Sequence, residues 1–252
     1  MPHAVITGAA GGIGRAVARR FAQGGFRLTL ADLPGDALED TAAALGAHPV
    51  PGDLTEPDTA GALVEGARAA GGPIAVLVNA AGVYPSLDMA DVTARTWDRL
   101  FDLNLRAPVL ATAAYARQAR QDGAGGCVVN ISSGSALRSR LGGGPYATSK
   151  AALEMATRAA ALELGAEGIR VNAVSPGFVP VGSSINPVSA EYAAAISVNP
   201  LGRAGTPSDI AEAVYWLSTP EASWITGEVL RVDGGSSAGT LHLPRIQEGH
   251  TA

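Results

Sequence analysis

Cysteine is almost absent from this chain of 252 residues, in which Cys127 is the only one. A single cysteine forms no intrachain disulfide, so the expected compartment is a reducing cytoplasm. Cys127 begins an apolar run, and free cysteine is one of the residue types most often buried. We therefore expect its side chain in the core rather than in a reactive site.

Basic charge and long apolar runs are also lacking. The formal net charge is -5 and the sequence pI is about 5.4, which disfavours a nucleic-acid-binding surface. No segment reaches the roughly 18 unbroken apolar residues of a membrane span, and the N-terminus carries no export signal. No group of potential ligands has metal-site spacing, because the histidines are scattered, at His3, His48, His242 and His250.

Short β-branched runs instead alternate with longer alanine-rich stretches. The runs predict strands near residues 3–7, 26–32, 47–51, 74–80, 127–132, 169–175 and 228–233. The stretches between them predict helices near residues 12–24, 36–45, 57–70, 94–120, 146–166 and 207–219. This alternation predicts an α/β fold with one Rossmann-type doubly wound parallel sheet of about seven strands and helices on both faces. We expect one domain over residues 1–252, with a lid at 178–206 and a weakly structured tail at 234–252.

Two polar residues stand one helical turn apart in the stretch "GGGPYATSKAALEM". Aromatic residues make up only 5% of the chain, yet Tyr146 precedes Lys150 by four positions. That spacing places both side chains on one helix face, where an ammonium lowers the pKa of a phenol. The pair suggests acid/base chemistry, although an ordinary surface pair has the same spacing. We expect the three preceding glycines to leave room for a substrate beside Tyr146.

A glycine-rich turn follows the first strand. Gly8, Gly12 and Gly14 open the first helix, where a backbone without side chains approaches a pyrophosphate closely. The second strand ends at Asp32, which can accept hydrogen bonds from a ribose 2′-hydroxyl and would repel a 2′-phosphate. NAD is therefore favoured over NADP, with a turn or helix-cap role for Asp32 as the alternative. Asp53 after the third strand either meets the adenine or caps the next helix.

Six motifs in order resemble the short-chain dehydrogenase/reductase family. They are "TGAAGGIG" (7–14), "NAAG" (79–82), the asparagine of "FDLNLRAP", the serine of "ISSGSA" thirteen residues before the tyrosine, "YATSK" (146–150) and "PG" (176–177). The resemblance runs from Thr7 to the "VDGG" at 232–235, and it implies a dinucleotide-binding and catalytic domain. It implies a catalytic set of Asn104, Ser133, Tyr146 and Lys150. It also implies cofactor contacts from Gly8, Gly12, Ile13, Gly14, Asp32, Asp53, Leu54, Asn79, Ala80, Gly82, Tyr146, Lys150, Pro176, Gly177 and Val179.

The resemblance implies hydride transfer between a nicotinamide and a carbinol carbon. Tyr146 is then the base in oxidation and the acid in reduction, and Lys150 favours its phenolate. Ser133, selected over Ser132 by the family spacing, holds the substrate oxygen. Asn104 holds a proton-relaying water through its side chain or through a helix carbonyl. The family often has a threonine where this chain has Val181, so Ser183 or Ser184 replaces that contact or the contact is lost.

The segment 178–206 contains one arginine near its end, at Arg203, and up to Pro200 a single charge, at Glu191. We therefore expect a small uncharged secondary alcohol or its ketone: a polyol or sugar, an alicyclic alcohol or an aryl carbinol. Arg138 and Arg140 would favour a hydroxy acid if they turned inward, but we expect them to be solvated loop residues. The alternatives are a 3-oxoacyl-[acyl-carrier-protein] reductase and a catalytically inactive NAD-binding regulator. Small residues on the helices near 94–120 and 146–166, together with the family resemblance, predict a homotetramer.

Overall fold

Seven parallel strands form one sheet in the computed structural model, which describes residues 1–182 and 188–241. The strands lie in the order β3-β2-β1-β4-β5-β6-β7, so the chain direction across the sheet reverses between β1 and β4. The predicted doubly wound parallel sheet is confirmed. The strands are β1 (His3–Thr7), β2 (Arg27–Asp32), β3 (His48–Pro51), β4 (Val76–Asn79), β5 (Gly126–Ile131), β6 (Ile169–Pro176) and β7 (Val229–Val232).

The central strands are buried on both faces because helices cover both sides of the sheet. Every residue of β1 and of β4 is buried. Strand β3 lies at the edge of the sheet and contains Pro49 and Pro51. Proline has no N–H to donate to a neighbouring strand, so it is tolerated in an edge strand. Cys127 is a core residue, as expected, and burial raises the pKa of its thiol to about 11.

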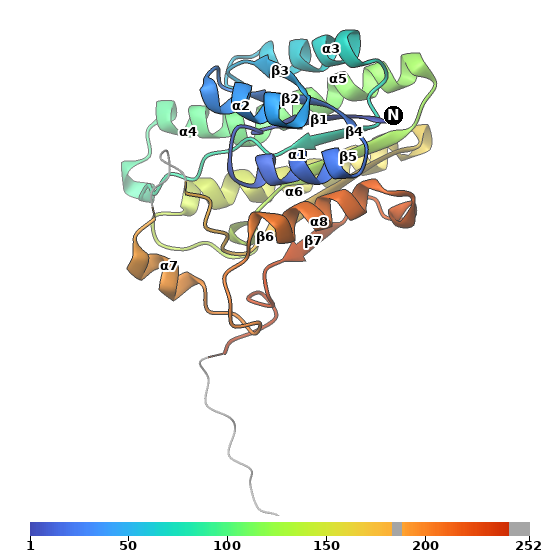
Figure 1. The fold of residues 1–252 in the computed structure, drawn as a ribbon. Helices are drawn as coiled ribbons and strands as arrows, with labels where there is room; N and C mark the ends of the chain where they lie inside the picture. Colours follow the sequence, from blue (N-terminus) through green and yellow to red (C-terminus); the bar gives the residue numbers. More distant parts are fainter. Residues whose placement is uncertain (183–187, 242–252) are drawn as a thin grey trace, which may run out of the picture.

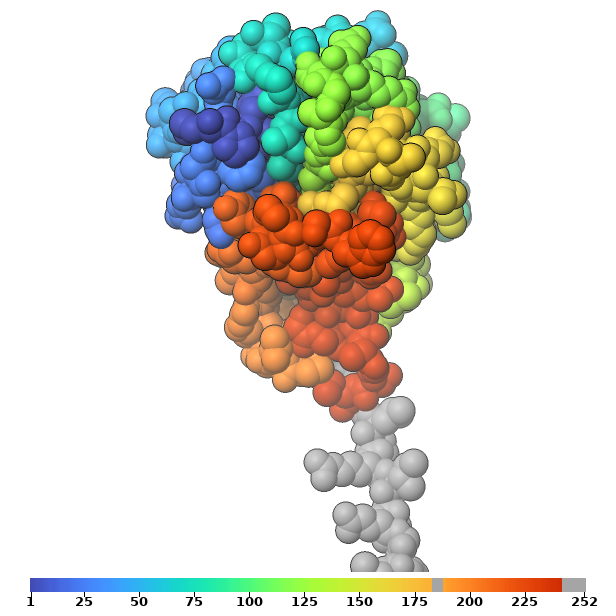
Figure 2. All heavy atoms as spheres, turned by 90° about the vertical axis from the view of Figure 1, so that its right-hand side faces the viewer, coloured from blue at the N-terminus to red at the C-terminus, as the bar shows by residue number. Residues whose placement is uncertain are grey.

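The helices divide into two layers (Figure 1). One apolar core joins the sheet to α1, α2 and α8, and the other joins it to α3, α5 and α6. Seen from the side on which the chain begins, α8 and the turn after it form a continuous band on the surface (Figure 2). These helices are α1 (Gly12–Gln23), α2 (Asp36–Leu45), α3 (Thr59–Gly71), α5 (Ala107–Asp122), α6 (Gly144–Leu164) and α8 (Pro207–Ser218).

The helix predicted at 94–120 is interrupted. It consists of α4 (Ala94–Phe101), a π-helical turn (Asp102–Arg106) and α5. A π turn inserts one residue into the helical ladder and is found mostly at functional sites. Alanine-rich periodicity gave no sign of this interruption.

The connection between β6 and α8 contains the short helix α7 (Ala190–Ile196), which lies beyond the carboxyl ends of the strands (Figure 1). After β7, the Asp233 carboxylate accepts hydrogen bonds from the backbone N–H groups of Gly235 and Ser237, at 2.8 and 3.0 Å, and so orders the start of the tail. Within the described residues, no helix combines the length and the apolar character that a membrane span requires.

Buried His3 makes the stability of the fold depend on pH. Its Nδ1 donates to the Gly72 carbonyl, so its neutral Nε2 accepts from the Thr29 hydroxyl at 2.9 Å. Burial is the main cause that lowers the pKa of His3 below its ordinary 6.5. The unfolded chain therefore binds this proton first, and the contribution of neutral His3 to stability, complete above pH 6.5, is lost as the pH falls below that value.

We expect the free energy of unfolding to decrease as the pH falls below 6.5. Unfolding should be accompanied by the uptake of no more than one proton at His3. Denaturant titrations between neutral and mildly acidic pH measure it. His3→Gln should flatten the dependence, whereas His48→Gln should change it only slightly, because the exposed His48 is the smallest of the causes that lower the pKa of His3. Equal slopes in all three proteins would contradict the assignment to His3.

Candidate active site

The glycine turn joins β1 directly to α1. Gly8 and Gly12 have φ angles of +69° and +51°, which residues with a Cβ rarely adopt. A Cβ on Gly14 would lie 2.0 Å from the Gly8 carbonyl oxygen. The first turn of α1 therefore packs on the backbone of the loop, and the N-terminus of the helix faces the cleft beyond the sheet.

The two predicted adenine-side acids hold backbone turns. Asp32 accepts from the N–H groups of Ala10 and Leu33, both at 2.8 Å, so its carboxylate ties the glycine turn to the end of β2. It does not cap α2, which begins after Gly35. Asp53 accepts from the backbone and the hydroxyl of Thr55, and these bonds lower its pKa. It therefore does not cap α3, which follows Asp58.

The loop after β4 is held by a hydroxyl that was not among the predicted site residues. Thr7 Oγ1 accepts from the N–H groups of Ala80 and Ala81, at 3.1 and 3.2 Å. Asn79, which was predicted to contact the cofactor, is buried and donates to Asn130 Oδ1 at 2.9 Å. Asn79 is absent from the lining of the cleft. The side-chain amide of Asn79 thus cross-links two strands in the core, and its cofactor contact stays a prediction.

Asn104 lies in the π turn and fastens the same loop. Its Oδ1 accepts from the Val83 N–H at 3.0 Å, and its Nδ2 donates to the Val83 carbonyl at 2.8 Å and to Ser149 Oγ. A Cβ on Gly82 would lie 3.1 Å from Asn104 Oδ1 and 3.5 Å from Lys150 Nζ, so these residues converge. The side-chain amide already makes three hydrogen bonds, which favours the main-chain carbonyl as the group that holds the predicted water.

The structure separates the two candidate serines. Ser132 is buried, and its hydroxyl donates to Glu154 Oε1 at 2.8 Å. Ser133 is half-buried, lines the cleft, and accepts from the Ser135 N–H at 3.2 Å. The Ser133 side chain acts to lower the pKa of the Tyr146 phenol. The Ser132 hydroxyl is already bonded to Glu154, which favours Ser133 as the serine beside Tyr146.

Tyr146 and Lys150 lie on one face of α6. Lys150 Nζ is 6.0 Å from the centroid of the Tyr146 ring and donates to the Ile131 carbonyl at 2.8 Å. Lys150 is the only lysine in the chain, a signal that a residue count alone would have given. Burial lowers its pKa to about 8. Burial is also the largest influence on Tyr146, whose pKa is raised, so in the protein alone the neighbouring cation does not make the phenol acidic.

The three glycines before Tyr146 have a different reason from the one expected. Gly142 has a φ of +68°, which fits a tight turn. A Cβ on Gly143 would lie 2.9 Å from Arg140 Cγ, and one on Gly144 would lie 2.6 Å from Met89 Sδ. The glycines allow close packing of the loop against these side chains rather than open space for a substrate.

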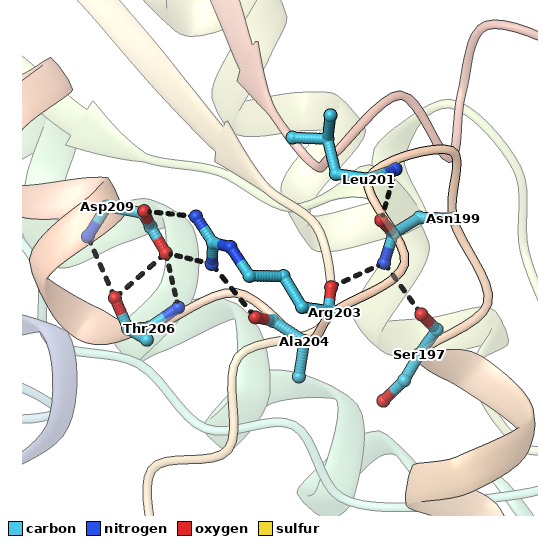
Figure 3. A network of polar contacts seen from close by, with 7 residues as sticks. All are labelled: Ser197, Asn199, Leu201, Arg203, Ala204, Thr206 and Asp209. Carbon is cyan, nitrogen blue, oxygen red and sulfur yellow. Dashed lines mark hydrogen bonds and ion pairs between the residues drawn. The ribbon is translucent and has the colours of Figure 1, made fainter.

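The segment after β6 returns to the glycine turn. Val181, at the position of the usual threonine, would lie 3.3 Å from a Cβ on Gly12, so its side chain packs against that turn. The alternatives Ser183 and Ser184 lie outside the described residues. Further along, Arg203 pairs with Asp209 through two hydrogen bonds of 2.8 Å, and Asn199 ties three backbone groups together (Figure 3). These contacts anchor the end of the segment to the start of α8.

Most of the predicted site residues border one cleft at the carboxyl ends of the strands, at the point where the strand order reverses. Its volume is about 1560 Å³, more than the roughly 300–1,000 Å³ of a small-ligand pocket. The lining includes every predicted cofactor residue except Asn79, together with Ser133. The glycine turn and Asp32 border the cleft, as do Tyr146 and Lys150 on α6.

Comparison with known proteins decides the family. Residues 8–237 match a family described as "Enoyl-(Acyl carrier protein) reductase". A solved structure titled "short chain dehydrogenase/reductase family protein" superposes with a TM-score of 0.84 at 36% identity, covering 94% of this chain and 98% of that one. The chain belongs to the short-chain dehydrogenase/reductase family.

Relatives within this family are named for different substrates. Galactitol 2-dehydrogenase (L-tagatose-forming) of Cereibacter sphaeroides is 35% identical, over 92% of this chain and 93% of the relative. (3R)-3-hydroxyacyl-CoA dehydrogenase of Mus musculus is 33% identical, over 92% and 95%. A metagenomic blue fluorescent protein in complex with NADPH is 34% identical with a TM-score of 0.84, over 93% and 97%.

The cleft fits the dinucleotide that this family uses. The glycines at 8, 12 and 14 line the cleft and leave no room for a Cβ within the turn itself, whereas a Cβ on Gly11 would meet no atom within 4 Å. Backbone N–H groups at the start of α1 provide the positive end that a pyrophosphate requires. Asp32 lies beside this turn, where its carboxylate accepts from the Ala10 N–H and borders the cleft.

Proposed function

We propose that this oxidoreductase interconverts a small secondary alcohol and its ketone with NAD as the cofactor. One observation carries the proposal: Ser133 and Tyr146 line the same cleft as the glycine turn and Asp32, and the Ser133 hydroxyl acts to lower the pKa of the Tyr146 phenol. A bound nicotinamide dinucleotide would supply the hydride acceptor or donor. The residues of the chain then have to orient the alcohol and move one proton.

Proton transfer falls to Tyr146. Its phenolic oxygen takes the hydroxyl proton of the alcohol in oxidation and returns a proton to the ketone in reduction. Ser133 Oγ holds the same substrate oxygen, which fixes its distance from the phenol. The Lys150 ammonium donates to the Ile131 carbonyl and, from the same face of α6, stabilises the negative charge of a Tyr146 phenolate. Asn104 binds the backbone of Val83 and so holds the loop at Gly82 next to the Lys150 ammonium.

Asp32 supports NAD as the cofactor, although a structural neighbour binds NADPH. Its carboxylate would repel a 2′-phosphate, whereas the neutral amide of Asp32→Asn keeps an acceptor for Ala10 N–H. We expect Asp32→Asn to shift the ratio of kcat/KM for NADP to that for NAD by about tenfold or more toward NADP, about 1.4 kcal/mol. Initial rates with both cofactors measure this ratio.

The matched control is Asp40→Ala, which removes an exposed acid from α2 outside the cleft. It should leave the ratio unchanged. A wild-type enzyme that already prefers NADP, or an Asp32→Asn variant with an unaltered ratio, would contradict the role given to Asp32.

A substrate screen tests the function as a whole. Formation of reduced nicotinamide is followed with NAD and NADP over polyols, alicyclic alcohols, aryl carbinols and a 3-hydroxyacyl-CoA. Oxidation of a free alcohol with NAD supports the proposal. Turnover of the acyl thioester alone with NADP would favour the carrier-linked reductase, in keeping with the match to the acyl-carrier-protein reductase family. Nucleotide binding without turnover of any compound would favour a regulator.

We also propose that the enzyme is a homotetramer that pairs through α5 and α6. Apolar side chains on these helices are exposed to solvent in the single chain, with exposed fractions of 41% at Val109, 62% at Met155 and 86% at Leu162. Helix pairing between copies would bury them. Sedimentation of a monomer at micromolar concentration would overturn this assembly.

A further inference from the structure

Arg140 differs from the other arginines that border the cleft. It follows Ser133 by seven residues and lies in the loop before α6. Three further arginines line the cleft, and all are exposed: Arg15, Arg99 and Arg138. Arg140, which was expected to be a solvated loop residue, is half-buried. Arg138 is exposed as expected, although its guanidinium donates to the Ser236 carbonyl at 2.7 Å.

The guanidinium of Arg140 lies between the catalytic helix and the segment that follows β6. Its Cζ is 5.0 Å from the centroid of the Tyr192 ring, which belongs to α7 and also lines the cleft. Its positive charge is close enough to Tyr146 to lower the pKa of the phenol. Arg140 therefore lies near the group that would handle the substrate hydroxyl.

No carboxylate in the described part of the chain forms an ion pair with Arg140. Its side chain makes one long hydrogen bond, from Nη1 to the Leu141 carbonyl at 3.3 Å. Six other arginines do form ion pairs: Arg20, Arg68, Arg106, Arg120, Arg158 and Arg203. A partly desolvated guanidinium with unfilled donors in a cleft is suited to an anionic ligand.

The loop also holds Arg140 in position. Its Cγ would be 2.9 Å from a Cβ on Gly143, and its carbonyl accepts from the Gly143 N–H at 3.0 Å. An aromatic face against a guanidinium leaves the in-plane N–H groups available, and those groups match the two oxygens of a carboxylate. The lining of the same cleft includes aromatic and aliphatic residues, such as Tyr84, Val188 and Ile196, beside several serines.

We propose that Arg140 binds a carboxylate carried by the substrate, so that the alcohol is a hydroxy acid whose hydroxyl reaches Ser133 and Tyr146. This inference rests on the proposed function and narrows its substrate class. The apolar lining fits a hydrocarbon ring or chain between the two polar groups. Oxidation gives the corresponding keto acid. One hydride would pass from the carbinol carbon to NAD⁺, which becomes NADH, and the hydroxyl proton would pass to Tyr146.

Matched acids and amides test the inference independently of turnover. Benzoate and cyclohexanecarboxylate are compared with benzamide and cyclohexanecarboxamide by calorimetry, using the full chain saturated with NADH. We expect each acid to bind about 10- to 100-fold more tightly than its amide, as a charge-assisted pair contributes. Arg140→Gln should abolish this difference, Arg140→Lys should retain part of it, and Arg138→Gln should retain it in full. Unchanged affinity for NADH shows that the variants are folded and that the effect is on the acid.

Turnover assays separate a failure of the carboxylate site at Arg140 from a failure of the proposed alcohol oxidation. Hydroxycyclohexanecarboxylates are assayed with NAD beside their carboxamides, in the wild type and in Arg140→Gln. Equal binding of acids and amides, or a preference that survives Arg140→Gln, overturns the carboxylate site even if neutral alcohols are oxidised. Dependence on Arg140 only for a coenzyme A thioester also overturns it, because the anion is then a phosphate. If no alcohol is oxidised but acids bind through Arg140, the proposed function fails and the site stands.

Discussion

Replacing Tyr146 by phenylalanine is expected to lower kcat/KM for alcohol oxidation by about 1000-fold or more, since a positioned general acid or base contributes roughly 10²–10⁴-fold. The substitution removes the hydroxyl and keeps the ring, whose centroid lies 6.1 Å from that of the Tyr84 ring. Neither the fold nor the glycine turn depends on that hydroxyl, so affinity for NADH and the melting temperature should change little. Steady-state kinetics together with nucleotide titration separates the two effects.

Tyr215→Phe is the matched control, because Tyr215 packs against Phe21 and Phe26 away from the cleft. Its activity should stay close to that of the wild type. If Tyr146→Phe retains turnover within about tenfold of the wild type, another group moves the proton and the assignment is wrong. A parallel loss of NADH binding would instead mean that the ring shapes the cofactor site.

Replacing Gly14 by alanine is expected to disrupt the glycine turn. The added methyl group would lie 2.0 Å from the Gly8 oxygen and 2.6 Å from its carbonyl carbon, and both are backbone atoms that cannot rotate away. Overpacking of this kind costs about 1–3 kcal/mol and occasionally more. A Cβ on Gly8 would lie 2.7 Å from the Ala81 nitrogen and 2.8 Å from the Ala80 carbonyl, so a shift of Gly8 also disturbs the loop after β4. We expect a lower free energy of unfolding and at least tenfold weaker nucleotide binding, about 1.4 kcal/mol.

Gly66→Ala provides the control for Gly14→Ala. Gly66 lies in the interior of α3, is exposed, and a Cβ there would meet no atom within 4 Å. Alanine should therefore stabilise the protein by about 0.5–1 kcal/mol, the ordinary gain in a helix. Chemical denaturation and NADH titration of both variants test the contrast. A Gly14→Ala protein with wild-type stability and affinity would show that the close contact at the turn relaxes without cost.

Local patterns were sufficient for the elements and for most of the cleft. Apolar runs buried on both faces require helices on both sides, so the parallel sheet follows from strand and helix alternation. The carboxyl ends of parallel strands meet at one edge, which is why Asp32, Asp53 and Ser133 could be assigned to one site. Tyr146 and Lys150 share a face because the helical repeat allows only that.

The sequence by itself determined the order of strands and helices, the glycine turn and the one-turn spacing of Tyr146 and Lys150, because each depends on residues close along the chain. Only the tertiary structure decided which polar groups were already engaged: Asn79 with Asn130 in the core, and Asn104 with the Val83 backbone. The tertiary structure also decided that burial raises the pKa of Tyr146. It placed Arg140 half-buried at the cleft, without an ion pair to any carboxylate of the described residues. Burial and hydrogen-bond partners come from segments distant in sequence, and spacing along the chain carries no record of them.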